Sequence, residues 1–163
     1  MAAVGPGQDA ARLAGTPPEE RAAVPDVAFH DPGGRPVSLG SFRQRNAVVL
    51  AFLHEGCEPC AAFARDLAAL EPEIRWAGGV IRAVLGRPSA LAIPALIDPG
   101  GTARRRLLGP DADLPTVLVI DRYGAPWASY PVPGHRFPSA EEIAASVRHE
   151  AFQCPECGAP AWE

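Results

Sequence analysis

Apolar residues in the first half of the chain follow two different patterns. Residues 47–53 and 79–85 form nearly unbroken apolar runs with β-branched side chains, which is typical of strands covered on both faces. The first run is followed by apolar side chains at helical spacing, namely Phe63, Ala64, Leu67 and Leu70. This spacing predicts a helix that ends at Pro72, and the run before it predicts a central strand.

Turn-forming residues predict two hairpins. Residues 24–39 contain two short alternating segments on either side of Pro32-Gly33-Gly34, and residues 116–131 contain two more around a turn at 122–125. Each pattern is that of two antiparallel strands joined by a turn. A further short strand is predicted at 94–97.

Capping residues predict two more helices. Thr102 is a candidate N-cap for a short helix that ends at Gly109, while Ser139 and Glu142 have the spacing of a capping box at the start of the last helix. The apolar face of that last helix is formed by Ile143 and Val147. Alternating strands and helices with a late hairpin predict an α/β fold, with a central mixed β-sheet flanked by helices and an N-terminal β-hairpin.

The chain length indicates one modest domain. We expect a flexible N-terminal arm over residues 1–23, a single domain over 24–151, and a C-terminal tail over 152–163. The N-terminus lacks a basic segment followed by an apolar stretch, and no window approaches about 18 apolar residues. These features predict a cytoplasmic protein without a membrane partner.

Charge excludes several function classes. All 15 basic residues are arginine, and 19 acidic residues give a net charge of −4, so lysine-based catalysis and a phosphate-binding-loop lysine are excluded. The densest basic run, Arg104-Arg105-Arg106, is expected to be a solvated helix face. We predict no nucleic-acid partner.

The four cysteines form two pairs, Cys57/Cys60 and Cys154/Cys157, each with two intervening residues. Pairs of this kind in a cytosolic chain indicate redox chemistry or metal binding. Cys57 stands where the central strand gives way to a helix, so unpaired backbone N–H groups and the helix dipole are expected to lower the pKa of its thiol. Cys60 follows on the same side of the first turn, within reach of a disulfide.

The residues between the first two cysteines affect this chemistry differently. Pro59 fits the first helical turn, where its missing N–H has no intrahelical acceptor. Glu58 places a carboxylate beside Cys57 and opposes thiolate formation, which favours a moderate or reducing pair over a strongly oxidising one. A zinc site at this corner is disfavoured, because the sequence places only two ligands there.

Three segments carry a resemblance to a known family. Asn46-Ala-Val-Val-Leu-Ala-Phe-Leu-His-Glu-Gly-Cys57-Glu-Pro-Cys60 resembles the strand, loop and active-site helix of the thioredoxin-like superfamily. The hairpin at 24–42 is similar to the opening of its redoxin branch, and Asp113-Leu114-Pro115-Thr116 is similar to its cis-proline segment. The resemblance implies a thioredoxin-like fold over about residues 24–150 and a cis Leu114–Pro115 bond facing the two sulfurs.

The resemblance also implies a function. We expect a thiol–disulfide oxidoreductase in which Cys57 attacks a disulfide, Cys60 resolves the mixed disulfide, and Pro115 shapes the groove for the substrate. Its partners would be protein or small-molecule disulfides or thiols and a thiol reductant, with no cofactor required.

The chain also departs from the superfamily's pattern. Ala51 replaces a buried acid and Gly56 replaces a tryptophan, which leaves Glu55, Glu58 and His54 as candidates for proton transfer. One alternative function is a redoxin-type thiol peroxidase with an antioxidant role, in which Cys60 captures a sulfenic acid on Cys57. His54 stands where the peroxidase pattern has a threonine, which argues against this alternative.

The second pair lies in the sequence Cys154-Pro-Glu-Cys157-Gly, which looks like one knuckle of a zinc ribbon. A knuckle supplies two thiolates, whereas a closed zinc site takes four ligands, so His149 or a homodimer that pools two knuckles would complete it. A second redox pair is an equally supported interpretation. A further alternative function is therefore a non-catalytic binding module that holds zinc at Cys154 and Cys157.

Overall fold

The computed structural model describes residues 22–109 and 112–153. The predicted N-terminal arm and C-terminal tail fall almost entirely outside these ranges, and Cys154 and Cys157 lie outside them. Domain boundaries at these two ends therefore stay predictions. Within the described ranges, no helix is long and apolar enough to cross a bilayer.

The described chain is built on a seven-stranded mixed sheet with the order β2-β1-β5-β4-β3-β6-β7. The strands are β1 (Ala28–His30), β2 (Pro36–Ser38), β3 (Ala47–Phe52), β4 (Gly79–Leu85), β5 (Ala95–Ile97), β6 (Thr116–Ile120) and β7 (Pro126–Pro131). β3 pairs in parallel with β4 and antiparallel with β6, while β1 and β2 form the predicted N-terminal hairpin. The α/β fold with a central mixed sheet is confirmed.

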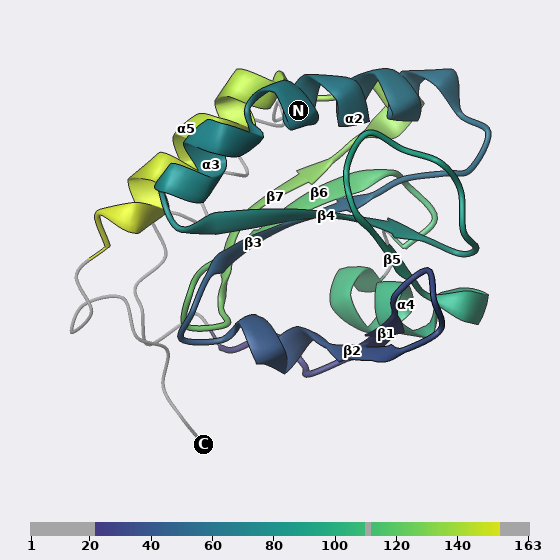
Figure 1. Ribbon diagram of the computed structural model, residues 1–163, viewed down its shortest axis with the longest axis horizontal. Coiled ribbons are helices and arrows are strands. Elements are labelled where there is room, and N and C mark those ends of the chain that lie inside the picture. The colour runs from purple at the N-terminus through teal and green to yellow at the C-terminus, as the bar shows by residue number, and fades with distance from the viewer. Residues whose placement is uncertain (1–21, 110–111, 154–163) are drawn as a thin grey trace, which may run out of the picture.

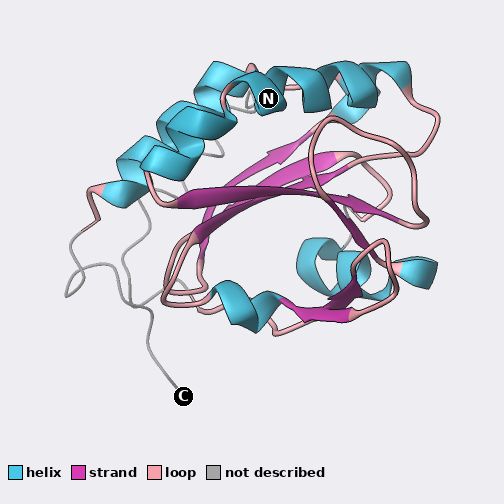
Figure 2. Ribbon diagram, in the orientation of Figure 1, coloured by secondary structure: helices cyan, strands magenta, loops and turns pink. Residues whose placement is uncertain are grey.

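Helices cover both faces of the sheet (Figures 1 and 2). The helices are α2 (Glu58–Ala69), α3 (Glu71–Trp76), α4 (Thr102–Leu108) and α5 (Ala140–Ala151). α2, α3 and α5 lie on one face, and α4 lies on the opposite side with the β1–β2 hairpin. This arrangement gives the central strands an apolar environment on both faces.

The central position of β3 follows from its composition. All of its residues are buried, and because side chains alternate along a strand they divide between two core clusters. Val49 and Ala51 pack in the cluster beneath α2 and α5, while Leu50 and Phe52 pack in the cluster next to the hairpin and α4. The unbroken apolar run thus fits a strand covered from both sides.

Two helix boundaries differ from the sequence-based prediction. Pro72 does not simply end a helix, because α3 begins at Glu71 with Pro72 in its first turn, a position that tolerates a missing N–H. At α4, Gly101 is the N-cap, and the buried Asp98 carboxylate accepts from the N–H groups of Ala103 and Arg104. Thr102 is therefore the first helical residue rather than the cap.

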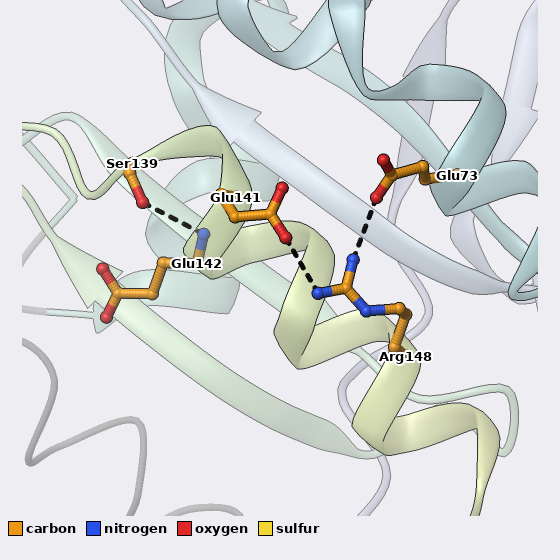
Figure 3. Close-up of polar contacts among 5 residues, drawn as sticks. All are labelled: Glu73, Ser139, Glu141, Glu142 and Arg148. Carbon is orange, nitrogen blue, oxygen red and sulfur yellow. Dashed lines mark hydrogen bonds and ion pairs between the residues drawn. The ribbon is translucent and has the colours of Figure 1, made fainter.

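The predicted cap of α5 is confirmed (Figure 3). The Ser139 hydroxyl accepts a hydrogen bond from the Glu142 N–H at 3.0 Å. Arg148 extends from the same helix to Glu141 at 2.9 Å and to Glu73 of α3 at 3.0 Å. These contacts join α3 to α5, which lie side by side on one face of the sheet.

Candidate functional site

Cys57 lies in the connection between the central strand and α2. Gly56 has a φ of 66°, a left-handed conformation that glycine adopts without a steric penalty. The chain then passes through Cys57, which has extended backbone angles and serves as the N-cap of α2. Its Sγ accepts a hydrogen bond from the Cys60 N–H at 3.2 Å, so the sulfur faces the N-terminal end of the helix.

The first cysteine pair forms a disulfide. The Cα atoms of Cys57 and Cys60 are 5.2 Å apart, within the usual range for this bond. Cys57 is partly exposed, whereas Cys60 has 0% of its surface exposed and belongs to the main core cluster. The two sulfurs therefore differ in their accessibility to a partner.

The two carboxylates beside the disulfide have other partners. Glu58 is exposed and forms an ion pair with Arg65 at 2.9 Å. Glu55 accepts a hydrogen bond from the Arg87 N–H at 2.8 Å, which ties the loop before α2 to the loop after β4.

The hydrogen bonds of Glu55 also determine its charge. Desolvation raises the pKa of the Glu55 carboxyl, but hydrogen bonds from the backbone N–H groups of Glu55, Arg87 and Gly86 and the charge of Arg87 lower it by more. The net result is a pKa below the ordinary value, so Glu55 is an anionic acceptor at neutral pH. Three residues were predicted as candidates for proton transfer, and two of them, Glu55 and Glu58, are held by hydrogen bonds or an ion pair to other residues.

His54 lies beside a second histidine that sequence analysis did not single out. The rings of His54 and His135 have centroids 5.9 Å apart and meet edge to face. One imidazole nitrogen of His135 and the Sγ atoms of Cys57 and Cys60 all lie within 4.8 Å of one another. His135 is therefore part of the site, although it has no sequence spacing that relates it to the cysteines.

Strand register explains why His135 reaches the disulfide. Phe52, at the end of β3, is paired with Thr116, at the start of β6, and Thr116 is paired with Pro131, at the end of β7. The loop after β7 therefore lies at the same edge of the sheet as the loop before α2. Phe137 anchors that loop, because its ring stacks on Phe63 of α2 at 4.5 Å.

Pro115 lies at this same edge but not in the predicted conformation. It is buried, and its carbonyl accepts from the Val132 N–H at 2.8 Å. The described residues contain no cis peptide bond, so the expected cis Leu114–Pro115 bond is wrong. The trans isomer is the intrinsically favoured form of an X–Pro bond, and the Arg104 guanidinium donates to the Leu114 carbonyl at 2.7 Å in this arrangement.

Arg104 does not lie on a solvated helix face, as was predicted for the run Arg104-Arg105-Arg106. The guanidinium is half-buried and also donates to the Ala112 carbonyl, so this residue holds the segment before Pro115 in place. Burial lowers the pKa of Arg104, while nearby carboxylates, including Asp113, oppose that shift. Arg105 and Arg106 are exposed, as expected for a solvated helix face.

A cavity of about 260 Å³ opens beside Cys57. Its lining combines polar side chains with apolar ones: His54, Cys57, Glu58, Ala61, Leu85, Ser89 and Leu91. A second hollow of about 220 Å³ is lined by His54, Arg104, Arg105 and Asp113. His54 lines both, whereas only the first cavity is lined by a cysteine of the disulfide, Cys57.

Solved structures share this arrangement of elements. A secreted thiol-disulfide isomerase from Corynebacterium glutamicum matches with a TM-score of 0.67 and 21% identity over 80% of this chain and 86% of its own. For a putative thiol:disulfide interchange protein DsbE from Chlorobium tepidum, the TM-score is 0.63 at 20% identity, with 80% and 96% covered. Peroxidoxin BcpB from Mycobacterium tuberculosis gives 0.66 at 19% identity, with 82% and 97% covered.

These matches decide the architecture. The chain has a thioredoxin-like fold. No protein-family model matches the sequence, and no curated protein matches it. The thioredoxin-like fold was predicted from the Cys57–Cys60 segment and is confirmed, while the roles of Cys57, Cys60 and Pro115 and the cytoplasmic location stay predictions.

Proposed function

We propose that this protein is a thiol–disulfide oxidoreductase in which Cys57 is the nucleophile and Cys60 the resolving cysteine. The observation that carries the proposal is the unequal exposure of two bonded sulfurs at the start of α2. A partner disulfide has access to the partly exposed Cys57, whereas Cys60 is covered. The thioredoxin-like fold supports the same conclusion by analogy.

The proposed reaction transfers two electrons from the dithiol to a disulfide. The Cys57 thiolate attacks one sulfur of the partner, so that a mixed disulfide forms and the other partner sulfur leaves as a thiolate that takes up a proton. Cys60 then gives up its proton to solvent and attacks the Cys57 sulfur. The second partner thiolate leaves, and the Cys57–Cys60 disulfide is restored.

The start of α2 supports attack by Cys57 rather than Cys60. A thiolate at an N-cap is stabilised by nearby backbone N–H groups and by the positive end of the helix dipole, and Cys57 Sγ already accepts from the Cys60 N–H. Glu58 opposes this effect only weakly, because its carboxylate is exposed and paired with Arg65.

The proposal is tested by reduction of insulin disulfides with dithiothreitol as the electron source. We expect Cys57→Ser to abolish the accelerated reduction, because no nucleophile remains. Cys60→Ser, reduced and then separated from dithiothreitol before insulin is added, should accumulate a mixed disulfide on Cys57, visible by mass spectrometry, because no other thiol is present to resolve it. The control Cys154→Ala should keep the activity, and full activity in Cys57→Ser would contradict the proposal.

The same variants separate the oxidoreductase from the two alternative functions. A thiol peroxidase would consume hydrogen peroxide through Cys57 and form a sulfenic acid there. If the protein is a zinc-binding module, the Cys154→Ala substitution should remove both bound zinc and self-association. The unsubstituted protein would then show no insulin reduction. The reduction potential of the Cys57/Cys60 couple then gives the direction of electron flow, since about 30 mV corresponds to a roughly tenfold change in the equilibrium constant.

A further inference from the structure

Three metal-ligating atoms from two separate parts of the sequence meet at the disulfide. The Sγ atoms of Cys57 and Cys60 and one imidazole nitrogen of His135 lie within 4.8 Å of one another. In a tetrahedral zinc site, with Zn–S bonds of about 2.3 Å and Zn–N bonds of about 2.0 Å, neighbouring ligand atoms are roughly 3.5–3.8 Å apart. Reduction of the disulfide frees the sulfurs to separate, so small side-chain rotations bring all three atoms to this spacing.

His54 lies outside this group of three and is the residue that we assign as the fourth ligand, which requires its ring to turn toward the sulfurs. Its ring centroid is 5.9 Å from that of His135, and two imidazoles on one tetrahedral ion have centroids about 5 Å apart. His54 is partly buried and directly follows the last buried residue after β3, Leu53. Sequence analysis counted only the two cysteines as ligands at this corner. His54 is three residues before Cys57, and the tertiary structure adds His135.

We propose that the reduced chain binds one Zn(II) ion through Cys57, Cys60, His135 and His54. Two thiolates balance the charge of the ion, and two sulfur with two nitrogen ligands form a set that suits tetrahedral Zn(II). A dithiol or phosphine reductant supplies two electrons to break the S–S bond, and the ion then displaces one proton from each thiol. The disulfide and the bound ion exclude each other, because both use the same two sulfurs.

The backbone at His135 is consistent with a binding role. Its φ is 57°, a left-handed conformation that is uncommon outside glycine and that clusters at functional sites. Among the described residues the one other non-glycine with a positive φ is Gln44. The stacking of Phe137 on Phe63 fixes the loop that holds His135 against α2.

The test uses the full chain with Cys154→Ser and Cys157→Ser, so that the second pair contributes no thiolates. The protein is reduced with a phosphine without oxygen and titrated with Zn(II) against a chromophoric chelator. We expect one ion per reduced chain and none at this site in the oxidised chain. Co(II) used as a spectroscopic probe should show thiolate charge-transfer bands.

Histidine variants decide the ligand set. His135→Gly and His54→Ala should each weaken Zn(II) binding by more than about tenfold, since changes to groups that merely support ligands already cost about 10–100-fold. The matched control His30→Ala, in the exposed end of β1, should bind as the parent does. Glycine accepts the left-handed backbone at residue 135, so this variant keeps its fold, which circular dichroism checks.

Two results would overturn the proposal. One is a reduced parent chain that binds no Zn(II) at micromolar concentration, and the other is a His135→Gly or His54→Ala chain that binds as tightly as the parent. Insulin reduction measured in the presence of a chelator is independent of this result. Failure of the metal site therefore leaves the proposed oxidoreductase function intact, and the reverse also holds.

Discussion

His135 shows how one residue can be held at a site against its own backbone preference. A non-glycine residue with a left-handed backbone is destabilised by about 1–2 kcal/mol, yet the loop between β7 and α5 keeps His135 at a φ of 57°. Its ring lies against His54 and near both sulfurs. The cost at this residue is offset by the packing of the loop, in which Phe137 is stacked on Phe63.

This strain predicts the effect of substitution on stability. His135→Gly should raise the free energy of unfolding of the oxidised, metal-free chain by about 0.5–1 kcal/mol, because relief of strain exceeds the extra entropy of glycine in the unfolded state. His135→Ala should give no such gain, since alanine has the same strain. Urea unfolding followed by circular dichroism measures both, and Gln44→Gly, at a φ of 61°, is the matched position.

A lower stability of His135→Gly than of His135→Ala would contradict this account. Such a result would mean that the left-handed backbone at residue 135 costs less free energy than the added entropy of glycine in the unfolded state.

At the scale of elements, three of the four described α-helices have a side chain at or just before their start that accepts from free backbone N–H groups. Cys57 does so for α2, Asp98 for α4 and Ser139 for α5. The cap of α2 differs from the others because its acceptor is the Cys57 sulfur, which we propose as the nucleophile. If Cys57 has the proposed role, one sulfur atom both caps α2 and attacks the substrate, whereas the caps of α4 and α5 lie outside the proposed site.

The α5 cap can be tested without touching the site. Ser139→Ala should lower the free energy of unfolding by about 1 kcal/mol, because the Glu142 N–H loses its acceptor. Arg148→Met removes two exposed ion pairs from the same helix and should cost no more than about 0.5–1 kcal/mol. Thermal and urea unfolding compare the two variants, and an Ser139→Ala chain as stable as the parent would show that water replaces the cap.

At the scale of the whole molecule, low pH should lower the free energy of unfolding by weakening the contacts that hold the β1–β2 hairpin. Asp26 accepts from the Ser38 hydroxyl at 2.7 Å and from the Gly40 N–H at 2.9 Å, which joins the segment before β1 to the end of β2 and to the turn that follows it. The Ser38 and Gly40 hydrogen bonds lower the pKa of Asp26, desolvation opposes them, and the charges of Arg43 and Arg106 add to the decrease.

The sign of the pH effect follows from this direction. Because the pKa of Asp26 is lower in the folded state than its ordinary value of 3.8, its contribution is present above that pH and is lost as pH falls through the folded-state pKa. Asp26→Asn should therefore lower the free energy of unfolding at pH 7 by about 0.5–1 kcal/mol, given the exposure of the carboxylate. Below the folded-state pKa the variant and the parent should converge.

Urea midpoints at pH 7 and in acid measure this difference. A constant difference across the range would mean that the charge of Asp26 has no part in holding the hairpin.

The sequence by itself determined the features that depend on neighbouring residues. The apolar run at 47–53 predicted the central strand, the turn residues predicted both hairpins, and the capping box predicted the start of α5. These features could be predicted because backbone preference and burial pattern depend on residues that are close together in the sequence. The Cys57–Cys60 pair was recognised for the same reason, since its two sulfurs lie within one helical turn.

Only the tertiary structure decided which distant residues complete the site. His135 reaches the disulfide because the register between β3, β6 and β7 brings the loop after β7 to the end of β3, and no spacing in the sequence encodes that register. The trans Leu114–Pro115 bond and the half-buried Arg104 likewise depend on contacts across the fold. Adjacent residues specify local backbone geometry, whereas contacts between remote segments form only when the whole sheet assembles.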